Sequence, residues 1–310
     1  MVPFKLNFTT ETTLFSYMEK QVDKLMCHGQ NRTAETYHST LNSFRNFRNN
    51  TDLSLRELSN EVLSDYAFHL KSRGISPNTV AFYLKRLRAV YNKAVEEELV
   101  ENRFPFRKIS VSSEKTVKRA IPLKDIRVLK HLDLSDCLSR SFARDMFLFS
   151  FYTRGMSFVD IAHLRKTDLH DGILTYRRQK TGQLLAIHWE PCMRRIADKH
   201  RSEPTSPYLL DIINPSHGDI RKQCHNAITL INRHLKEIGR SIGLPLPLTM
   251  YVARHSWASI ARNEGIPLSV ISEGMGHESE RTTRIYLASL ETQVINEANK
   301  KKSSKSSKIE

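Results

Sequence analysis

The chain has 310 residues and a formal net charge of +15, from 48 Lys and Arg residues against 33 Asp and Glu residues. This length favours two domains, and an apolar fraction of 39% is sufficient for packed cores. The excess of cations favours a nucleic acid as partner over a protein that is merely basic. No apolar run approaches the roughly 20 residues that span a membrane. Residues 1–15 lack a secretory core, so we expect a cytoplasmic protein without membrane contact.

The cysteines and histidines do not follow the usual metal-binding patterns. The four cysteines are far apart, and none belongs to a CxxC pair: Cys27, Cys137, Cys192 and Cys224. The 13 histidines include no HExxH pair. We therefore interpret the cysteines as reduced packing residues, and we predict neither a metal ion nor a cofactor.

Residues 1–104 are expected to form an all-helical domain. Three helical patterns precede the clearest one: Thr10 to Met26, Arg32 to Phe47, and Asn60 to Arg73. In the fourth, Ser76 is a good N-cap and Pro77 occupies the first helical position. Apolar residues then recur at helical spacing and predict a buried stripe: Val80, Tyr83, Leu84, Leu87, Val90, Tyr91, Ala94 and Val95.

Cations on this fourth helix lie outside the apolar stripe: Lys85, Arg86, Arg88 and Lys93. They form either an ordinary solvated face or a surface that rests against DNA phosphates. The helix is followed by residues 105–119, which are polar, basic and rich in serine and show no periodicity. We interpret that segment as an interdomain linker.

Residues 120–299 are expected to form a second domain, mainly α with a small antiparallel sheet. Pro122–Asp125 is typical of a helix start, and helices are predicted at Ser141–Tyr152 and Asp219–Ile238. Between the last two, the sequence alternates around a turn at Lys180, Thr181 and Gly182, which predicts paired strands. One face of the second strand carries Leu184, Ala186 and His188, and the other carries Leu185, Ile187 and Trp189. Residues 300–310 are cationic and of low complexity, so a disordered tail is expected.

The stretch from Leu248 to Leu290 contains residues that suit phosphate chemistry. Arg254, His277 and Tyr286 are spaced so that a guanidinium, an imidazole and a phenol can converge on one phosphate. This stretch resembles the tyrosine recombinases, the phage-type integrase family. The family pattern is His-x-x-Arg-His, then Gly-His, then Tyr nine residues later. Here Met275-Gly276-His277 is followed by Thr282 and Tyr286.

The resemblance implies a role for each matching residue. Tyr286 would be the nucleophile, and because a phenol has a pKa of about 10, it needs cationic or basic neighbours to be activated. Arg254 would clamp the non-bridging oxygens through two parallel hydrogen bonds. His277 would bond the scissile phosphate, and Lys180, at the predicted turn, would be the general acid for the leaving 5′-oxygen. In the absence of the motif, each residue would be given an ordinary structural or solvated role.

Two positions depart from the family pattern. Tyr251 stands where the family has a histidine, and a phenol is a poor base at neutral pH, so His277 or water remains as the proton acceptor. Ser157 stands where the family has its first arginine. We predict that Arg154 supplies the missing cation, with Arg177 and Arg178 as nearby alternatives. Ser157 and Asp160 also form an ordinary helix-start pair.

The resemblance implies a two-domain clamp on duplex DNA, with a helical core-binding domain and a catalytic domain. The implied enzyme is a site-specific recombinase that integrates, excises or inverts DNA through a 3′-phosphotyrosine. It would act as a homotetramer on inverted-repeat core sites, be a monomer or weak oligomer when free, and associate with a bacterial nucleoid. The two departures resemble Bacteroides-type recombinases. A type IB topoisomerase-like enzyme and a catalytically impaired DNA-binding protein remain as alternatives.

Overall fold

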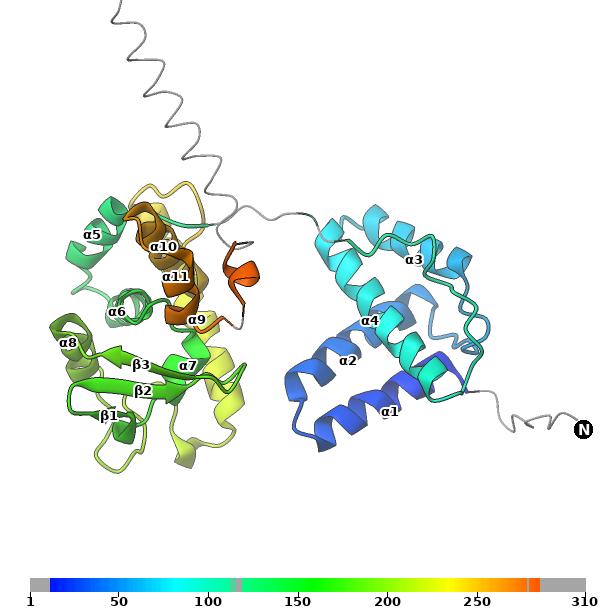
Figure 1. Ribbon diagram of the computed structural model, residues 1–310, viewed down its shortest axis with the longest axis horizontal. Helices are drawn as coiled ribbons and strands as arrows, with labels where there is room; N and C mark the ends of the chain where they lie inside the picture. Colours follow the sequence, from blue (N-terminus) through cyan, green and yellow to red (C-terminus); the bar gives the residue numbers. More distant parts are fainter. Residues whose placement is uncertain (1–11, 113, 115–118, 278, 285–310) are drawn as a thin grey trace, which may run out of the picture. The chain divides into compact units, whose positions relative to one another are not determined.

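The computed structural model describes residues 12–112, 114, 119–277 and 279–284. The chain divides into two units, Met1–Thr116 and Val117–Glu310, and each has its own hydrophobic core (Figure 1). The two units are therefore described separately. Within the described ranges, no helix has the length and apolar character needed to cross a membrane.

Four helices are described in the first unit: α1 (Leu14–Cys27), α2 (Asn31–Phe47), α3 (Asn60–Ser72) and α4 (Pro77–Glu96). Helix α2 packs on α1, α3 and α4, and α3 also packs on α4. The predicted start of α4 is confirmed, because the Ser76 hydroxyl accepts a hydrogen bond from the Thr79 backbone at 3.3 Å. Most of the predicted stripe is fully buried, and Tyr83 and Val95 are partly buried against the same core.

The predicted start of α1 at Thr10 was too early. Helix α1 begins at Leu14, and its N-cap, Thr13, has extended backbone angles. Thr13 forms an isolated bridge with Ser54, and the Leu14 N–H donates to the Leu53 carbonyl at 2.9 Å. The chain enters the helix from this extended pairing, a contact that helical periodicity does not reveal.

The segment that follows α4 packs against the first unit. Phe106 is buried, and Ile109 and Val111 are partly buried against the same core. The Asn78 side chain, at the start of α4, accepts from the Glu114 N–H at 2.7 Å and donates to the Glu114 carbonyl at 3.3 Å. The described part of the predicted 105–119 linker is therefore held by the helical unit, while the domain boundaries themselves stay predictions.

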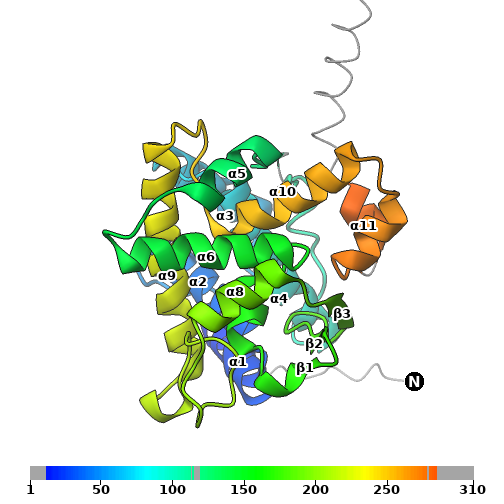
Figure 2. The same cartoon turned by 90° about the vertical axis from the view of Figure 1, so that its left-hand side faces the viewer.

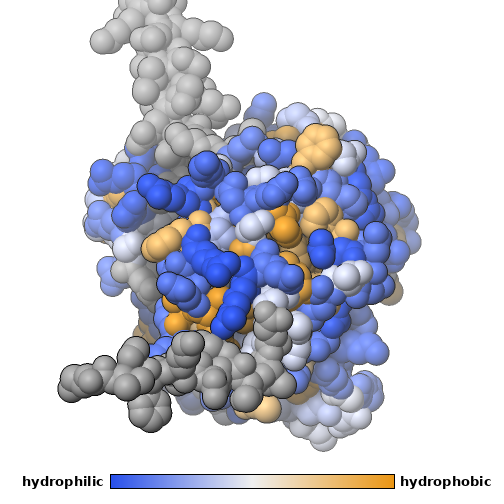
Figure 3. Space-filling model, turned by 90° about the vertical axis from the view of Figure 1, so that its right-hand side faces the viewer, coloured by the Kyte–Doolittle hydropathy of each residue, from blue (hydrophilic) through white to orange (hydrophobic). Residues whose placement is uncertain are grey.

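The cations of α4 lie at the surface of the first unit. Lys85 and Arg88 are exposed, and Arg86 lies 5.4 Å from the centre of the Phe82 ring. The face of this unit in Figure 3 is mainly hydrophilic with scattered hydrophobic side chains. Phe68 is one exposed aromatic residue, with a relative accessibility of 74%.

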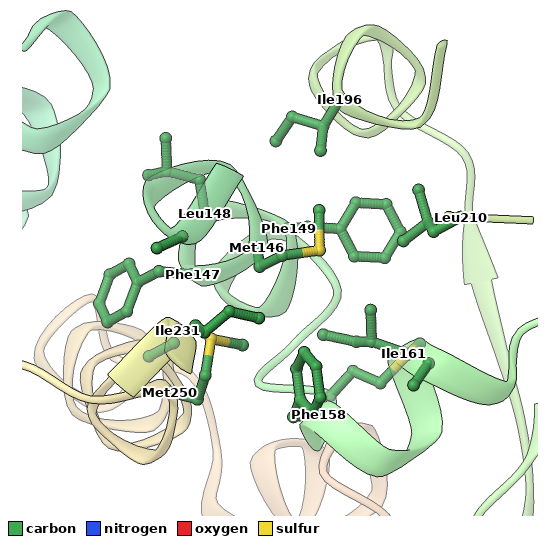
Figure 4. Packing of buried hydrophobic residues seen from close by; sticks show 14 of the residues in the cluster. Met146, Phe147, Leu148, Phe149, Phe158, Ile161, Ile196, Leu210, Ile231 and Met250 are labelled. Carbon is green, nitrogen blue, oxygen red and sulfur yellow. The ribbon is translucent and has the colours of Figure 1, made fainter. Parts of the chain in front are cut away.

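Seven helices are described in the second unit: α5 (Leu123–His131), α6 (Leu138–Tyr152), α7 (Phe158–His163), α8 (Pro191–Lys199), α9 (Ile220–Ser241), α10 (Met250–Asn263) and α11 (Leu268–Gly274). Helix α6 is central, because α5, α8, α9 and α10 all pack on it (Figures 1 and 2). Phe147 projects from one side of α6, and Met146 and Phe149 project from the other, so residues on both sides of this helix belong to the core (Figure 4). This explains the strongly apolar character of that stretch.

The predicted sheet is confirmed as a three-stranded antiparallel sheet in the order β1 (Leu169–His170), β2 (Ile173–Arg177) and β3 (Leu184–His188). In β3, Ile187 is buried and pairs with Leu174, while Leu184 and His188 are exposed, as the alternation predicts. The hairpin bend forms at the expected place, where the Gly182 N–H donates to the Arg178 carbonyl at 2.8 Å. The predicted fold class, mainly helical with a small antiparallel sheet, is therefore confirmed.

A buried carboxylate joins α6 to the end of α8. Asp145 is only 4% exposed and accepts from Lys199 at 2.7 Å and from His200 at 2.8 Å, while Arg144 forms an ion pair with it at 2.8 Å. Burial alone would raise the pKa of Asp145, but the hydrogen bonds from His200 and Lys199 outweigh burial and lower it to about 2. The ionised carboxylate therefore stabilises the folded unit.

We expect Asp145→Asn to lower the free energy of unfolding of this unit by about 3 kcal/mol, because it leaves the largely buried Arg144 guanidinium without its carboxylate. In the native protein, the stabilisation should be complete above the unfolded-state pKa near 4 and be lost as the pH falls toward 2. Both tryptophans, Trp189 and Trp257, belong to this unit, so their fluorescence during urea unfolding reports on it.

Asp198→Asn is the matched control, because the Asp198–Arg201 pair is exposed. It should change the free energy of unfolding by less than about 0.5 kcal/mol. Equal effects of the two substitutions would contradict a structural role for the buried carboxylate.

Candidate active site

The side chain of Arg254, on α10, is fixed at both ends of its fork. It is 8% exposed, and its Nη1 donates to the Gly155 carbonyl at 2.8 Å. Its Nη2 donates to the Met275 carbonyl at 2.7 Å. These two bonds join α10 to the turn after α6 and to the end of α11, so three distant parts of the chain meet at one guanidinium.

Gly155 allows this close approach. Its φ is +74°, in the left-handed region that a residue without Cβ adopts readily. A Cβ at this position would lie 2.7 Å from the Arg254 Cα, which is closer than real side chains approach. The preceding Arg154 also has a positive φ, +60°, so the turn is tight.

His277 lies beside the guanidinium of Arg254. Its Nε2 is 3.0 Å from Nη2 of Arg254, and its Nδ1 is 2.7 Å from Oγ1 of Thr283. Burial and the positive charges of Arg254, Arg178 and Lys180 lower the pKa of His277 to about 4. The imidazole is therefore neutral at pH 7 and can accept a hydrogen bond.

Arg178, at the end of β2, is a second buried cation in this region. It is 9% exposed, and its Nη1 donates to the Gly276 carbonyl, next to His277. A Cβ on Gly276 would lie 2.8 Å from the Arg178 side chain, so a glycine is needed for this contact. Arg178 and His277 are thus close in space although they lie about one hundred residues apart in the sequence.

Arg154 and Tyr176 lie close to the same charges. Burial and the Asp160 carboxylate raise the pKa of Tyr176, whereas the charges of Arg178, Arg254 and Arg154 act to lower it. Arg154 is half-buried, and its Nη1 donates to the Ala186 carbonyl of β3 at 3.4 Å. The predicted cation is therefore near the cluster, although it is less buried than Arg178.

The remaining predicted residues are distributed around this cluster. Lys180 is exposed at the hairpin bend, and its charge acts on His277. Tyr251 is 60% exposed, and its ring packs edge-to-face on His255 with 4.4 Å between ring centres. Tyr286, the predicted nucleophile, lies outside the described residues, two positions beyond Arg284.

Ser157 and Asp160 form the predicted helix start. The Ser157 hydroxyl caps α7 by accepting from the Asp160 N–H at 3.3 Å, and it donates to the Asp160 carboxylate at 2.7 Å. The other Asp160 oxygen accepts from the Gln179 N–H at 2.8 Å. Asp160 therefore anchors the hairpin that carries Arg178 and Lys180, a role that the sequence did not reveal.

Two family models match most of the chain. The phage integrase SAM-like domain matches residues 13–111, and the phage integrase family matches residues 147–293. The chain belongs to the phage integrase family of tyrosine recombinases. The catalytic model spans all the residues described above, from the turn at Gly155 to His277, and continues through Tyr286.

Curated tyrosine recombinases are similar along most of their length. XerD of Halalkalibacterium halodurans is 22% identical over 260 residues, covering 75% of this chain and 78% of its own. XerA of Pyrococcus furiosus is 25% identical over 265 residues, covering 74% and 90%. This protein is accordingly an enzyme, a site-specific DNA recombinase, and the matches do not favour the topoisomerase-like or inactive alternatives.

Solved structures share the fold. A lambda integrase tetramer bound to a Holliday junction superposes with a TM-score of 0.68 at 16% identity, covering 89% of this chain and 78% of that one. The Tn1549 transposon integrase bound to transposon right end DNA gives a TM-score of 0.64 at 14% identity, covering 93% and 100%. The recombinase therefore has the two-domain fold of these integrases.

The sequence did not identify Thr283, and it indicated Arg178 only as an alternative. Thr283 is fully buried and contacts His277, whereas Thr282, the residue noted in the motif, is exposed. Of the adjacent residues Arg177 and Arg178, Arg178 is buried and Arg177 is exposed. The alternation of β2 gives a signal, because Arg178 lies in register with the inward-facing Leu174 and Tyr176. In the part of the chain that the structure describes, no cluster of three or more metal-ligating side chains occurs.

We expect Gly155→Ala to reduce DNA cleavage by at least about tenfold, because a displaced Arg254 loses its alignment. Strain at positive φ would destabilise the fold by about 1 kcal/mol, and the clash adds about 1–3 kcal/mol. Gly172→Ala is the matched control, since its φ is +75° and no atom lies within 4 Å of the added Cβ. Gly172→Ala should lower the stability of the fold through backbone strain but leave DNA cleavage unchanged. Equal losses of cleavage in the two variants would exclude a specific effect on Arg254.

Proposed function

We propose that this recombinase cleaves and rejoins duplex DNA through a phosphotyrosine formed at Tyr286. The observation that carries the proposal is the cluster of Arg254, Arg178 and His277, in which two buried guanidinium groups and a neutral imidazole meet. Positive charges gathered in a partly buried site favour an anion, and a guanidinium fork suits phosphate oxygens. The proposed nucleophile follows this cluster by nine residues in the sequence.

The reaction needs a nucleophile, positive charge and a proton donor. The Tyr286 oxygen would bond to phosphorus while the bond from phosphorus to the 5′-oxygen breaks. Arg254 and Arg178 would stabilise the charge on the non-bridging oxygens, and Lys180 would protonate the leaving 5′-oxygen. A 5′-hydroxyl from a partner strand then reverses the step, so the bond energy is retained.

We assign the second phosphate-binding cation to Arg178. Ser157, at the position of the family's first arginine, is engaged in capping α7. Arg178 is buried beside Gly276, and its charge acts directly on His277, whereas Arg154 is half-buried and bonded to a carbonyl of β3. This assignment replaces Arg154 as the main candidate and leaves it an accessory role.

The proton of Tyr286 requires an acceptor. The pKa of His277 is lowered to about 4, so its imidazole is neutral at pH 7 but is a weak base, and both of its ring nitrogens have hydrogen-bond partners. Tyr251 is exposed on α10, in the same helix as Arg254, where its phenol would donate to phosphate without acting as a base. Of the two candidates, His277 and water, we therefore favour a water as the acceptor.

The DNA partner follows from the family and the charge of +15. The solved relatives include a lambda integrase dimer on a core site and a tetramer on a Holliday junction. By analogy, four protomers of this protein would act on inverted-repeat core sites, in integration, excision or inversion. Action at a bacterial nucleoid in the cytoplasm follows from this substrate, and a Bacteroides-type origin stays a prediction.

A nicked suicide duplex built from the inverted repeats near the coding locus tests the proposal. The wild-type protein should form a covalent protein–DNA adduct that resists denaturation, and Tyr286→Phe should form none while it still binds the duplex. An adduct that persists in Tyr286→Phe would assign the nucleophile to another residue. Binding without any adduct from the wild type would instead favour a DNA-binding protein.

The assignment of Arg178 predicts a graded result in the same assay. Arg178→Ala should lower the cleavage rate by about 10²–10³-fold, the usual effect of losing one transition-state donor. Arg177→Ala is the matched control, because this adjacent cation is exposed and donates to the Gly182 carbonyl at 3.2 Å. Arg154→Ala should reduce the rate less than Arg178→Ala; the reverse order would return the role to Arg154.

A further inference from the structure

The two ring nitrogens of His277 have partners of different kinds. Nε2 faces Nη2 of Arg254 at 3.0 Å, and Nδ1 faces Oγ1 of Thr283 at 2.7 Å. An arginine can only donate hydrogen bonds, so Nε2 must be the acceptor and carry no proton. A neutral imidazole then carries its proton on Nδ1, from which it donates to the Thr283 hydroxyl.

The surroundings keep this imidazole neutral. Three cations act on it from different elements: Arg254 on α10, Arg178 at the end of β2, and Lys180 in the hairpin bend. Together with burial they oppose a second proton on the ring. His277 therefore has one proton to place, and the hydrogen-bond partners decide on which nitrogen it lies.

Phosphate reverses the requirement at Nε2. Phosphate oxygens of a diester only accept hydrogen bonds, so His277 can bond the scissile phosphate from Nε2 only if that nitrogen carries the proton. In the same event, a phosphate oxygen would replace Nε2 as the acceptor of the Nη2 hydrogen of Arg254, without a change in the orientation of the guanidinium. The deprotonated Nδ1 then needs a donor, and the Thr283 hydroxyl can supply one because it both donates and accepts.

We propose that Thr283 is a positioning residue that allows His277 to exchange tautomers when DNA binds. In the free protein, Nδ1–H donates to Thr283 and Nε2 accepts from Arg254. In the complex, the Thr283 hydroxyl donates to Nδ1, and Nε2–H donates to the phosphate. This inference rests on the proposed function, since it places the phosphate next to Arg254 and His277.

The exchange is balanced in protons and charge. Nε2 gains one proton from water and Nδ1 releases one to water, so the ring is neutral before and after the exchange. Thr283 suits this role because its side chain is fully buried, which keeps a solvent molecule from replacing its hydroxyl. A serine can perform both roles, whereas a valine of similar shape can perform neither.

The tautomer can be observed directly by nitrogen-15 NMR of the full chain with labelled histidines. His277→Asn identifies the His277 signals among the 13 histidines. In the free protein, Nδ1 should give the shift of a protonated nitrogen and Nε2 that of an unprotonated one. In Tyr286→Phe bound to the inverted-repeat duplex, the two shifts should exchange. The same tautomer in both states would overturn the proposal.

Two variants separate positioning from stability. Thr283→Val should lower the cleavage rate by roughly 10–100-fold, as expected when a histidine loses the partner of its second nitrogen, with DNA affinity unchanged. Thr283→Ser should restore the rate to within a few-fold of wild type. Wild-type adduct formation with an unaffected Thr283→Val would overturn this inference alone. The absence of an adduct from the wild type would overturn the proposed function, while the tautomer of the free protein would still be measurable.

Discussion

The catalytic unit depends on the placement of one guanidinium. Arg254 is buried and bonded to the carbonyls of Gly155 and Met275, so it closes a contact between α10, the turn after α6 and the end of α11. A buried arginine is stable only when its donors are satisfied. The same bonds that satisfy it in the free protein also fix its orientation, and a phosphate would find the fork already positioned.

Positive charge accumulates around this point. Arg178 lies against Gly276, and Lys180 lies in the adjacent bend. Together with Arg254 and burial, their charges lower the pKa of His277 and keep its imidazole neutral. Like charges in a partly desolvated site repel each other, so an anion that enters relieves the repulsion. The site is therefore electrostatically suited to a phosphodiester before any DNA is present.

Ser157, which stands in place of the family's first arginine, takes part in a hydrogen-bond network with Asp160. Without an arginine there, the hydroxyl caps α7 and holds the Asp160 carboxylate, and this carboxylate accepts from the Gln179 N–H. The hairpin end that carries Arg178 is anchored by that bond. The structure thus couples the absence of one cation on a helix to the placement of another at the end of a strand.

The sequence by itself determined the local elements and the motif. Ser76 and Pro77 mark the start of α4, and the alternation of β3 gives its buried face, because capping and periodicity are properties of neighbouring residues. The spacing of Arg254, His277 and Tyr286 also sufficed to identify the family.

Only the tertiary structure decided which side chains meet. The contact of Arg178 with Gly276 spans 98 positions, and that of Arg254 with Gly155 spans 99. The choice of Thr283 over its neighbour as partner of His277 depends on which hydroxyl the fold buries. Such contacts arise from the packing of elements that are distant in sequence, and no local pattern encodes them.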